Sequence, residues 1–456
     1  MATLTAVPVS TPRPMLTTPQ ILSRTLWVVW VLDVLLLIAL LTGGRIHRAG
    51  MQTVGRDTAP SIIAAQHIKS ALADMDANAA NELLSEGGQQ ANNALQTYET
   101  RRQEASKALI AAAQNITYGD AERDPILRIQ LGLGTYEARI QRARDLRQER
   151  NNAWIAAYSA AADLIDREIL PAADALDRAN LDVLNRTYDS QHRQSIVSRG
   201  FIVAAAAVIL AVLAFVQLFL TGRTHRLINL PLLLATCLTV GVTYYGLHGL
   251  ARVQNSLKVA REDAFTSIHA LWRARAVAYA ANADESRYLL DRQNTAKHEQ
   301  EFLTKRDALA QLPEGTTFQS LAQAAGSHVS SFTGYLADEL NNITFPGEQE
   351  AAVETLAAFG EYLKIDGQIR ALERGGHHQE AIALCTGTKL GESNWAFEQF
   401  DNALDKTLAI NQAAFDRAVT NGFAALAHFD INTSVCVVLI GVLTLLGLMQ
   451  RIREYR

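Results

Sequence analysis

Residues 200–221 read GFIVAAAAVILAVLAFVQLFLT, a run without a single charged side chain. A helix needs about 20 consecutive apolar residues to cross the hydrocarbon core of a bilayer, so this run predicts a membrane span. Three more windows share its character: residues 25–43, 227–247 and 431–449. The window at 25–43 is too long for the apolar h-region of a signal peptide, and no small-residue cleavage site directly follows it. We therefore predict four crossings, with both termini on one side.

The composition of the 456-residue chain is segregated rather than uniform. Hydrophobic residues make up 49% and charged residues 19%, but the apolar residues gather in the four windows. This pattern excludes a single soluble globular domain. There are three cysteines, Cys237, Cys385 and Cys436, and two of them lie in apolar windows, which excludes a disulfide framework. The long polar stretches are rich in alanine, which favours helices over sheets.

Charge predicts the orientation in the membrane. The short segments 1–24, 222–226 and 450–456 together carry seven arginines and one glutamate. The two long polar regions carry 35 basic and 44 acidic residues. Short loops rich in arginine stay in the cytoplasm, so we predict cytoplasmic termini and a plasma-membrane protein. Arginines that flank the other membrane ends, such as Arg45 and Arg199, oppose this orientation, but long domains translocate largely regardless of charge.

The two polar regions resemble each other and predict an internal repeat. Four short landmarks recur in the same order: 54–63 with 259–268, 115–118 with 342–345, 134–136 with 360–362, and 175–178 with 403–406. The offset grows from 205 to about 227 residues, so the second copy has about 22 extra residues before its second landmark. A repeated span, polar region and span predicts a duplicated architecture.

Within each copy the apolar periodicity is helical. Apolar residues from Ile68 to Leu83 recur at spacings of three and four, as on one face of an amphipathic helix. Glycine and proline separate the helices at Gly87-Gly88, Gly119-Asp120 with Pro125, Pro171, Pro313-Glu-Gly315, Pro346-Gly347 and Gly375-Gly376. We predict four helices per copy, the first and last continuous with the spans, in an up-down bundle.

The predicted fold class is thus an all-α membrane protein with four transmembrane helices and two duplicated extracytoplasmic helical bundles. The predicted segments are a disordered cytoplasmic tail (1–24), the first span (25–43), bundle 1 (44–199), the second span (200–221), a cytoplasmic hairpin (222–226), the third span (227–247), bundle 2 (248–430), the fourth span (431–449) and a cytoplasmic tail (450–456).

One stretch is unusually dense in polar groups: Asn282-Ala-Asp284-Glu285-Ser-Arg287-Tyr288. It lies near the far end of the first helix of the second copy, where a bundle tip binds a small ligand or a partner protein. Arginine holds carboxylates through paired hydrogen bonds, and two further arginines lie two or three turns away. The candidate ligand-binding or partner-binding residues are Arg273, Arg275, Asp284, Glu285 and Arg287. The alternative is a solvated helix end with local ion pairs.

Asp33 lies in the middle of the first span, and intramembrane carboxylates are usually functional. A hydrogen bond to Thr239 or Tyr244 of another span would satisfy it, and a simple packing contact is the alternative. For metals and cofactors we predict none. The grouping of His377-His378 with Glu380 and Cys385 matches no zinc spacing and favours a polar turn.

No catalytic motif points to an enzyme. Gly132-Leu-Gly134 lacks the third glycine of a dinucleotide loop, and the chain has no Walker loop, Gly-x-Ser-x-Gly elbow or HExxH. The arginines at 139–150 are interleaved with acidic residues, which indicates a solvated helix face and no nucleic-acid binding. We therefore predict a non-enzymatic protein.

The chain resembles the GlnX family of actinobacterial membrane proteins. The resemblance rests on the stretch 274–291, on Ala403-Leu-Asp-Lys406 and on the four-span layout, and the bundles look like the sensor domains of bacterial chemoreceptors. It implies a transducer that relays the state of an Asp/Glu-binding lipoprotein, GlnH-like, to a cytoplasmic Ser/Thr kinase, PknG-like, and so controls glutamate metabolism. The short predicted cytoplasmic segments, which have no room for an output domain, fit this role. Other predicted partners are membrane lipid and a second copy of the chain in a homodimer. The alternatives are a direct chemoreceptor-like sensor of a small ligand and a non-switching envelope scaffold.

Overall fold

The computed structural model describes residues 17–85, 87–224, 229–324 and 332–454, and these are almost entirely helical. Within them there is no strand, only an isolated bridge between Gln311 and Thr333, which confirms the all-α prediction. The α-helices and the π-helices (η) are α1 (Thr18–Gln52), η1 (Thr53–Thr58), α2 (Ala59–Leu84), α3 (Gly88–Gln114), α4 (Asp120–Gln148), α5 (Ala153–Leu164), η2 (Ile165–Ile169), α6 (Leu170–Thr224), α7 (Leu230–Lys258), η3 (Val259–Ala264), α8 (Phe265–Leu290), α9 (Thr295–Leu309), α10 (Phe318–Ala324), α11 (Tyr335–Leu340), α12 (Glu348–Arg374), α13 (His378–Thr386), α14 (Ser393–Ala425) and α15 (Phe429–Glu454).

The chain forms two compact units, which we name by their composition. The membrane unit comprises Met1–Ala49, Ser190–Gln254 and Phe423–Arg456, and the polar unit comprises Gly50–Asp189 and Asn255–Gly422. Both polar regions of the sequence therefore belong to the same compact unit.

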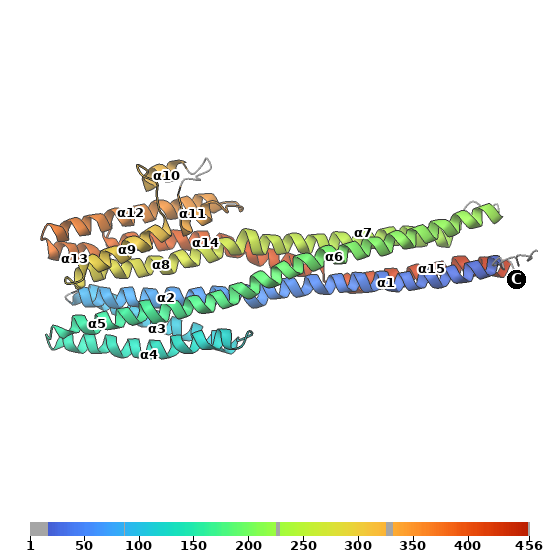
Figure 1. Cartoon of the computed structure of the whole chain (residues 1–456). Helices are drawn as coiled ribbons and strands as arrows, with labels where there is room; N and C mark the ends of the chain where they lie inside the picture. The colour runs from blue at the N-terminus through green and yellow to red at the C-terminus, as the bar shows by residue number, and fades with distance from the viewer. Residues whose placement is uncertain (1–16, 86, 225–228, 325–331, 455–456) are drawn as a thin grey trace, which may run out of the picture. The chain divides into compact units, whose positions relative to one another are not determined.

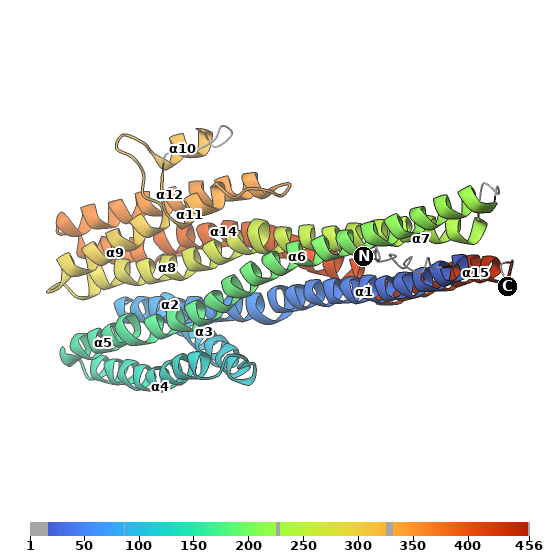
Figure 2. The same cartoon turned by 45° about the vertical axis from the view of Figure 1, so that its right-hand side comes forward.

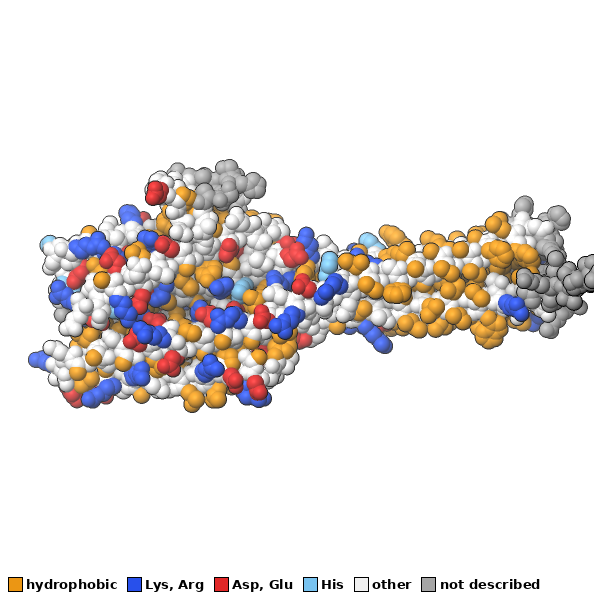
Figure 3. Space-filling model, viewed as in Figure 1, with side chains coloured by type: hydrophobic (Ala, Val, Ile, Leu, Met, Phe, Trp, Pro, Cys, Tyr) orange, Lys and Arg blue, Asp and Glu red, His pale blue; other side chains and the backbone are white. Residues whose placement is uncertain are grey.

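The membrane unit contains the four predicted spans, in α1, α6, α7 and α15. All four helices are long and apolar enough to cross a membrane, which confirms the multi-pass prediction. Large apolar side chains such as Trp27, Phe201 and Leu218 are exposed on them, as the orange surface of these helices shows in Figure 3. Exposed apolar surface of this kind is what a lipid environment covers.

Helix α1 begins earlier than the first span requires. Its first described turn is stabilised by Gln20, whose side-chain oxygen accepts the backbone N–H of Thr17 at 3.1 Å. This is half of a capping box, and Pro19 fits the first helical turn. Residues 18–24 of the predicted tail are therefore helical, whereas residues 1–16 of that tail and His225 and Arg226 of the predicted hairpin lie outside the described residues.

Three of the four spans continue as helix into the polar unit without a break. Uninterrupted helical stretches of 67, 70 and 61 residues run over Thr18–Leu84, Ala153–Gly222 and Leu230–Leu290. The fourth stretch, Ser393–Arg453, is interrupted only by a short turn between α14 and α15. The π-helices η1 and η3 lie where the first and third stretches enter the polar unit.

Pro171 does not separate two helices, contrary to our prediction. Helix runs through it from α5 via η2 into α6. Proline removes one backbone N–H donor and clashes with the carbonyl four residues earlier. The π-helix Ile165–Ile169 directly before it widens the turn, so the helix accommodates the proline without ending.

Helices α2 and α8 lie side by side at the centre of the polar unit (Figures 1 and 2). Helix α3 packs against α2, and α9 packs against α8. Breaks occur as predicted at Gly87-Gly88, at Pro346-Gly347 and at Gly375-Gly376. The second polar region has three short helices, α10, α11 and α13, in addition to its four long ones, so four helices is an undercount there.

Position 334, directly before α11, requires glycine both because of its backbone conformation and because a side chain would clash with its surroundings. Its φ is +115°, and an added Cβ would lie 2.6 Å from the carbonyl oxygen of Leu309. We expect Gly334→Ala to lower the free energy of unfolding by about 2 kcal/mol, measured by urea denaturation. Gly376→Ala is the matched control, because its φ is +81° but no atom lies within 4 Å of the added Cβ. Equal effects of the two substitutions would contradict the steric argument.

Candidate functional site

The polar stretch at the end of α8 is buried rather than solvated. Asp284, Glu285 and Ser286 have no exposed surface, and Arg287 is 1% exposed. The alternative of a solvated helix end is therefore wrong. The reason is that α2, from the first polar region, packs along α8 and covers the face that a single bundle would leave to water.

Arg287 is the centre of a buried ion cluster, defined here as Arg287 with Asp76, Asp166, Asp284 and Lys305. Its Nη1 donates to Asp166 Oδ2 at 2.7 Å and to Asp284 Oδ1 at 2.8 Å, and its Nη2 donates to Asp76. The ammonium group of Lys305 bonds to the other oxygen of Asp284. These residues come from α2, η2, α8 and α9, so the cluster joins both polar regions of the chain.

Two tyrosines complete the hydrogen bonds of the cluster. The hydroxyl of Tyr158 accepts from Arg287 Nε at 3.2 Å, and the hydroxyl of Tyr136 donates to Asp76 Oδ1 at 2.9 Å. Burial alone would lower the pKa of Arg287, but Asp166 and Asp76 raise it well above its usual value. The guanidinium therefore stays charged in the interior, where an unpaired charge would cost several kcal/mol.

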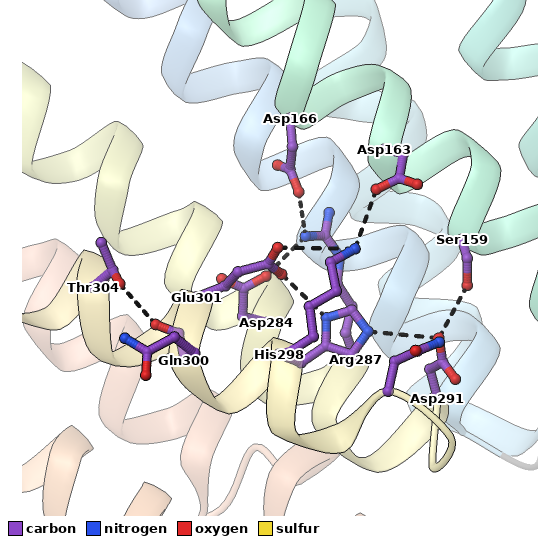
Figure 4. Close-up of polar contacts among 12 residues, drawn as sticks. Ser159, Asp163, Asp166, Asp284, Arg287, Asp291, His298, Gln300, Glu301 and Thr304 are labelled. Atoms are coloured by element: carbon purple, nitrogen blue, oxygen red, sulfur yellow. Dashed lines mark hydrogen bonds and ion pairs between the residues drawn. The ribbon is translucent and has the colours of Figure 1, made fainter.

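A cavity of about 250 Å³ lies beside this cluster, between α5 and η2 on one side and α8 and α9 on the other. Figure 4 shows its polar side chains turned toward one another. The lining residues are Tyr158, Ser159, Ala162, Asp163, Asp166, Arg287, Asp291, Asn294, Lys297, His298 and Glu301. Arg287, Asp291 and His298 are at most 5% exposed. Concave sites with convergent polar groups are the usual places for a small ligand.

Glu285 points away from Arg287 into a second buried cluster. Its carboxylate accepts from Ser393 Oγ at 2.8 and 3.0 Å and lies 3.9 Å from Cys385 Sγ. Burial raises the pKa of Glu285 well above its usual value, and the negative charge of Asp366 adds to this. Burial therefore favours the protonated form of Glu285.

The two arginines earlier on α8 lie apart from Arg287. Arg275 is 12 residues away on the same helix, which is about 18 Å along the axis. Its guanidinium pairs with Asp401 at 2.6 Å and with Asp405 at 3.1 Å. Arg273 lies over the ring of Tyr335, 4.7 Å from its centroid. The structure therefore brings Asp284 and Arg287 together and places Arg273, Arg275 and Glu285 in three other environments.

Asp33 is 5% exposed in the membrane unit. Within the described residues neither of its carboxylate oxygens has a hydrogen-bond partner. The expected bond to Thr239 is not formed, because the Thr239 hydroxyl donates to the carbonyl of Ala235 at 2.8 Å. Tyr244, the other expected partner, is 69% exposed.

Among the described residues, one group of side chains has the spacing of a metal site: Asp284, His298 and Glu301, whose ligand atoms lie within 4.8 Å of one another. Both oxygens of Asp284 already accept hydrogen bonds from cations, Arg287 and Lys305. The two histidines considered in the sequence pair with neighbouring glutamates, His377 with Glu380 and His378 with Glu373.

The comparisons with known proteins give one match. Residues 50–189 match the family described as the actinobacterial sensor domain. This match covers the first polar region and supports a signal-sensing role in an actinobacterial membrane protein. No curated protein and no solved structure matches the chain.

Proposed function

We propose that this chain, with an actinobacterial sensor domain in residues 50–189, is a transmembrane signal transducer of the plasma membrane. In this proposal the polar unit lies outside the cell and receives the state of an Asp/Glu-binding lipoprotein, GlnH-like. The membrane unit passes the change to a cytoplasmic Ser/Thr kinase, PknG-like, that controls glutamate metabolism. The protein itself catalyses no reaction.

The observation that carries this proposal is the continuity of the helices. Three uninterrupted stretches of 61 to 70 residues contain both a membrane span and a helix of the polar unit. A continuous helix acts as a rigid lever, so a small shift or rotation at one end is felt at the other. The charge distribution supports the orientation with cytoplasmic termini, because the arginine-rich segments are the short ones.

Matching local structure supports the proposed duplication of the two polar regions. Glu122 accepts the backbone N–H groups of Thr117 and Tyr118, and Glu348 accepts those of Thr344 and Phe345. All four bonds measure 2.6 to 2.8 Å. Each copy also begins with a π-helix, η1 or η3. In a duplicated chain the lipoprotein would bind either to one copy or where the two copies meet.

The relay is tested with the full chain in cells that contain the kinase and a candidate lipoprotein. Gln194 is an exposed residue inside α6, and Gln194→Pro would break that helix at a cost of about 3 kcal/mol. We expect this variant to bind the lipoprotein as the parent does but to lose the glutamate-dependent change in phosphorylation of a kinase substrate. Gln194→Ala, which preserves the helix, is the control and should respond normally.

Other outcomes separate the rival functions. A chain that responds to glutamate without the lipoprotein would be a direct sensor. A chain whose deletion leaves kinase output unchanged at every glutamate level would be a scaffold. A normal response of Gln194→Pro would contradict transmission through α6.

A further inference from the structure

The cavity beside Arg287 has an excess of negative charge. Four carboxylates and two permanent cations, Arg287 and Lys297, line it. With the neighbours bonded to these groups, Asp76, Asp284, Lys305 and Arg167, the balance is six carboxylates to four cations. Four of the five N–H groups of Arg287 are already bonded, to Asp76, Asp166, Asp284 and Tyr158. An anionic ligand such as a dicarboxylate would therefore meet repulsion here, whereas a cation would meet carboxylates with unused acceptor capacity.

His298 provides a second reason to expect a cation. Its ring is 5% exposed, and its Nδ1 makes no hydrogen bond within the described residues. This nitrogen lies 3.3 Å from Glu301 Oε2, while Nε2 lies 3.6 Å from Asp291. When the ring carries its one proton on Nε2, Nδ1 and Glu301 present two acceptors to the same point. A donor placed between them satisfies both.

Lys297 already places an ammonium group between two carboxylates of the cavity. Its ammonium group lies 3.2 Å from Asp163 and 3.9 Å from Glu301, which are on opposite walls of the cavity. The Lys297 side chain is 44% exposed, so it can leave for solvent without burying or stranding its charge. The position of Lys297 therefore shows that these walls bind a primary ammonium group.

We propose that this cavity binds a small organic cation whose primary ammonium group replaces Lys297 between Asp163 and Glu301 and donates to His298. A volume of about 250 Å³ is below that of sites for drug-sized ligands, so the ligand is small, such as a diamine or a basic amino acid. Because Asp163 belongs to α5 and Glu301 to α9, the ligand would bridge the two polar regions of the chain.

A metal ion fits the same walls less well. It would need Asp284 as a third ligand beside His298 and Glu301. Both oxygens of Asp284 are held by Arg287 and Lys305, and displacing either would leave a cation next to the metal. A bound ion would also leave most of the cavity unfilled.

The test measures binding to the full chain in lipid nanodiscs, by calorimetry with putrescine, L-glutamate or zinc chloride. We expect putrescine to bind and glutamate not to bind. Glu301→Gln should weaken putrescine binding about tenfold or more, because a hydrogen bond to a charged group is lost. Lys297→Met should strengthen it, because the internal competitor is removed. If Glu301 and Lys297 had only structural roles, their substitutions would not change putrescine affinity in opposite directions.

Glu361→Gln is the matched control, since Glu361 is a half-exposed glutamate that pairs with Lys364 on the same helix, α12. Its putrescine affinity should equal that of the parent. Four results would each overturn the proposal: zinc binding without putrescine binding, glutamate binding, no binding at all, or equal putrescine affinities of Lys297→Met and the parent.

The role of this ligand as a signal depends on the sensing function proposed above. The binding test, however, involves neither the lipoprotein nor the kinase, so the two proposals fail independently.

Discussion

Replacing Arg287 with methionine is expected to lower the free energy of unfolding by about 3–5 kcal/mol. Asp76 and Asp284 are at most 2% exposed, and both bond to the Arg287 guanidinium. Removal of the arginine leaves their negative charges buried beside Asp166, with only Lys305 to compensate. The measurement is urea denaturation of the full chain in detergent, followed by the fluorescence of the tryptophans.

Arg306→Met is the matched control for this prediction. Arg306 pairs with its sequence neighbour Asp307, and both side chains are about 40% exposed. Surface pairs of this kind contribute at most about 1 kcal/mol. Adding Asp284→Asn to Arg287→Met should recover part of the loss, because one stranded charge is removed. An effect of Arg287→Met no larger than that of Arg306→Met would contradict the assignment of Arg287 as the centre of the cluster.

The stability of the polar unit is expected to fall as the pH rises from about 4.5 to about 8, because of Glu339 on α11. Its side chain is 1% exposed, and burial raises its pKa from 4.5 to about 8. The neighbouring Glu348 contributes to this shift, and Ser267 and Asn411 oppose it. Glu348 Oε2 accepts two backbone N–H groups, which stabilise its negative charge beside Glu339.

The sign follows from proton binding. Between these pH values the native state holds the proton on Glu339 and the unfolded state has lost it, so stability decreases with pH. The full contribution is present below about pH 4.5 and is lost as the pH passes about 8. We expect a loss of roughly 2–4 kcal/mol over this window.

Glu339→Gln separates this effect from other titrations. Glutamine keeps an acceptor for Asn411, which donates to Glu339 Oε1 at 3.2 Å, and keeps a donor toward Glu348. Because glutamine does not ionise, the variant should have a flatter stability profile and be more stable than the parent at pH 8. Denaturation at pH 5 and pH 8 measures this, with the exposed Glu361→Gln as control. Identical pH slopes for Glu339→Gln and the parent would refute the prediction.

The spans and most helix ends could be predicted from the sequence because they depend on local properties. A charge-free run such as 200–221 identifies a span without knowledge of its neighbours. Gly347 identifies a helix boundary because its φ of +82° is one that few other residues adopt. Pro171 was misjudged because the compensating π-helix at Ile165–Ile169 has no signal in residue types or periodicity.

The candidate site could be predicted only in part, because only some of its features are local in the sequence. The density of polar residues between 282 and 288 indicated Asp284 and Arg287 on one helix. Their partners Asp76 and Asp166 lie in the first polar region, and each resembles an ordinary charged residue on an amphipathic helix. Only the packing of α2 against α8 shows that these charges are buried together. Periodicity within each copy carries no information about that pairing.

The span of the ion cluster along the chain also constrains biosynthesis. Asp76 and Arg287 are 211 residues apart, and Lys305 follows later still. A ribosome adds about 5–20 residues per second, so Asp76 waits roughly 10–40 seconds for the synthesis of its counter-charge, Arg287. During that interval two further membrane segments must be inserted before α8 emerges. The buried carboxylates of the first polar region therefore remain unpaired until the second polar region has reached the same face of the bilayer. A chain truncated before residue 287 would keep these carboxylates unpaired, and we expect it to be degraded.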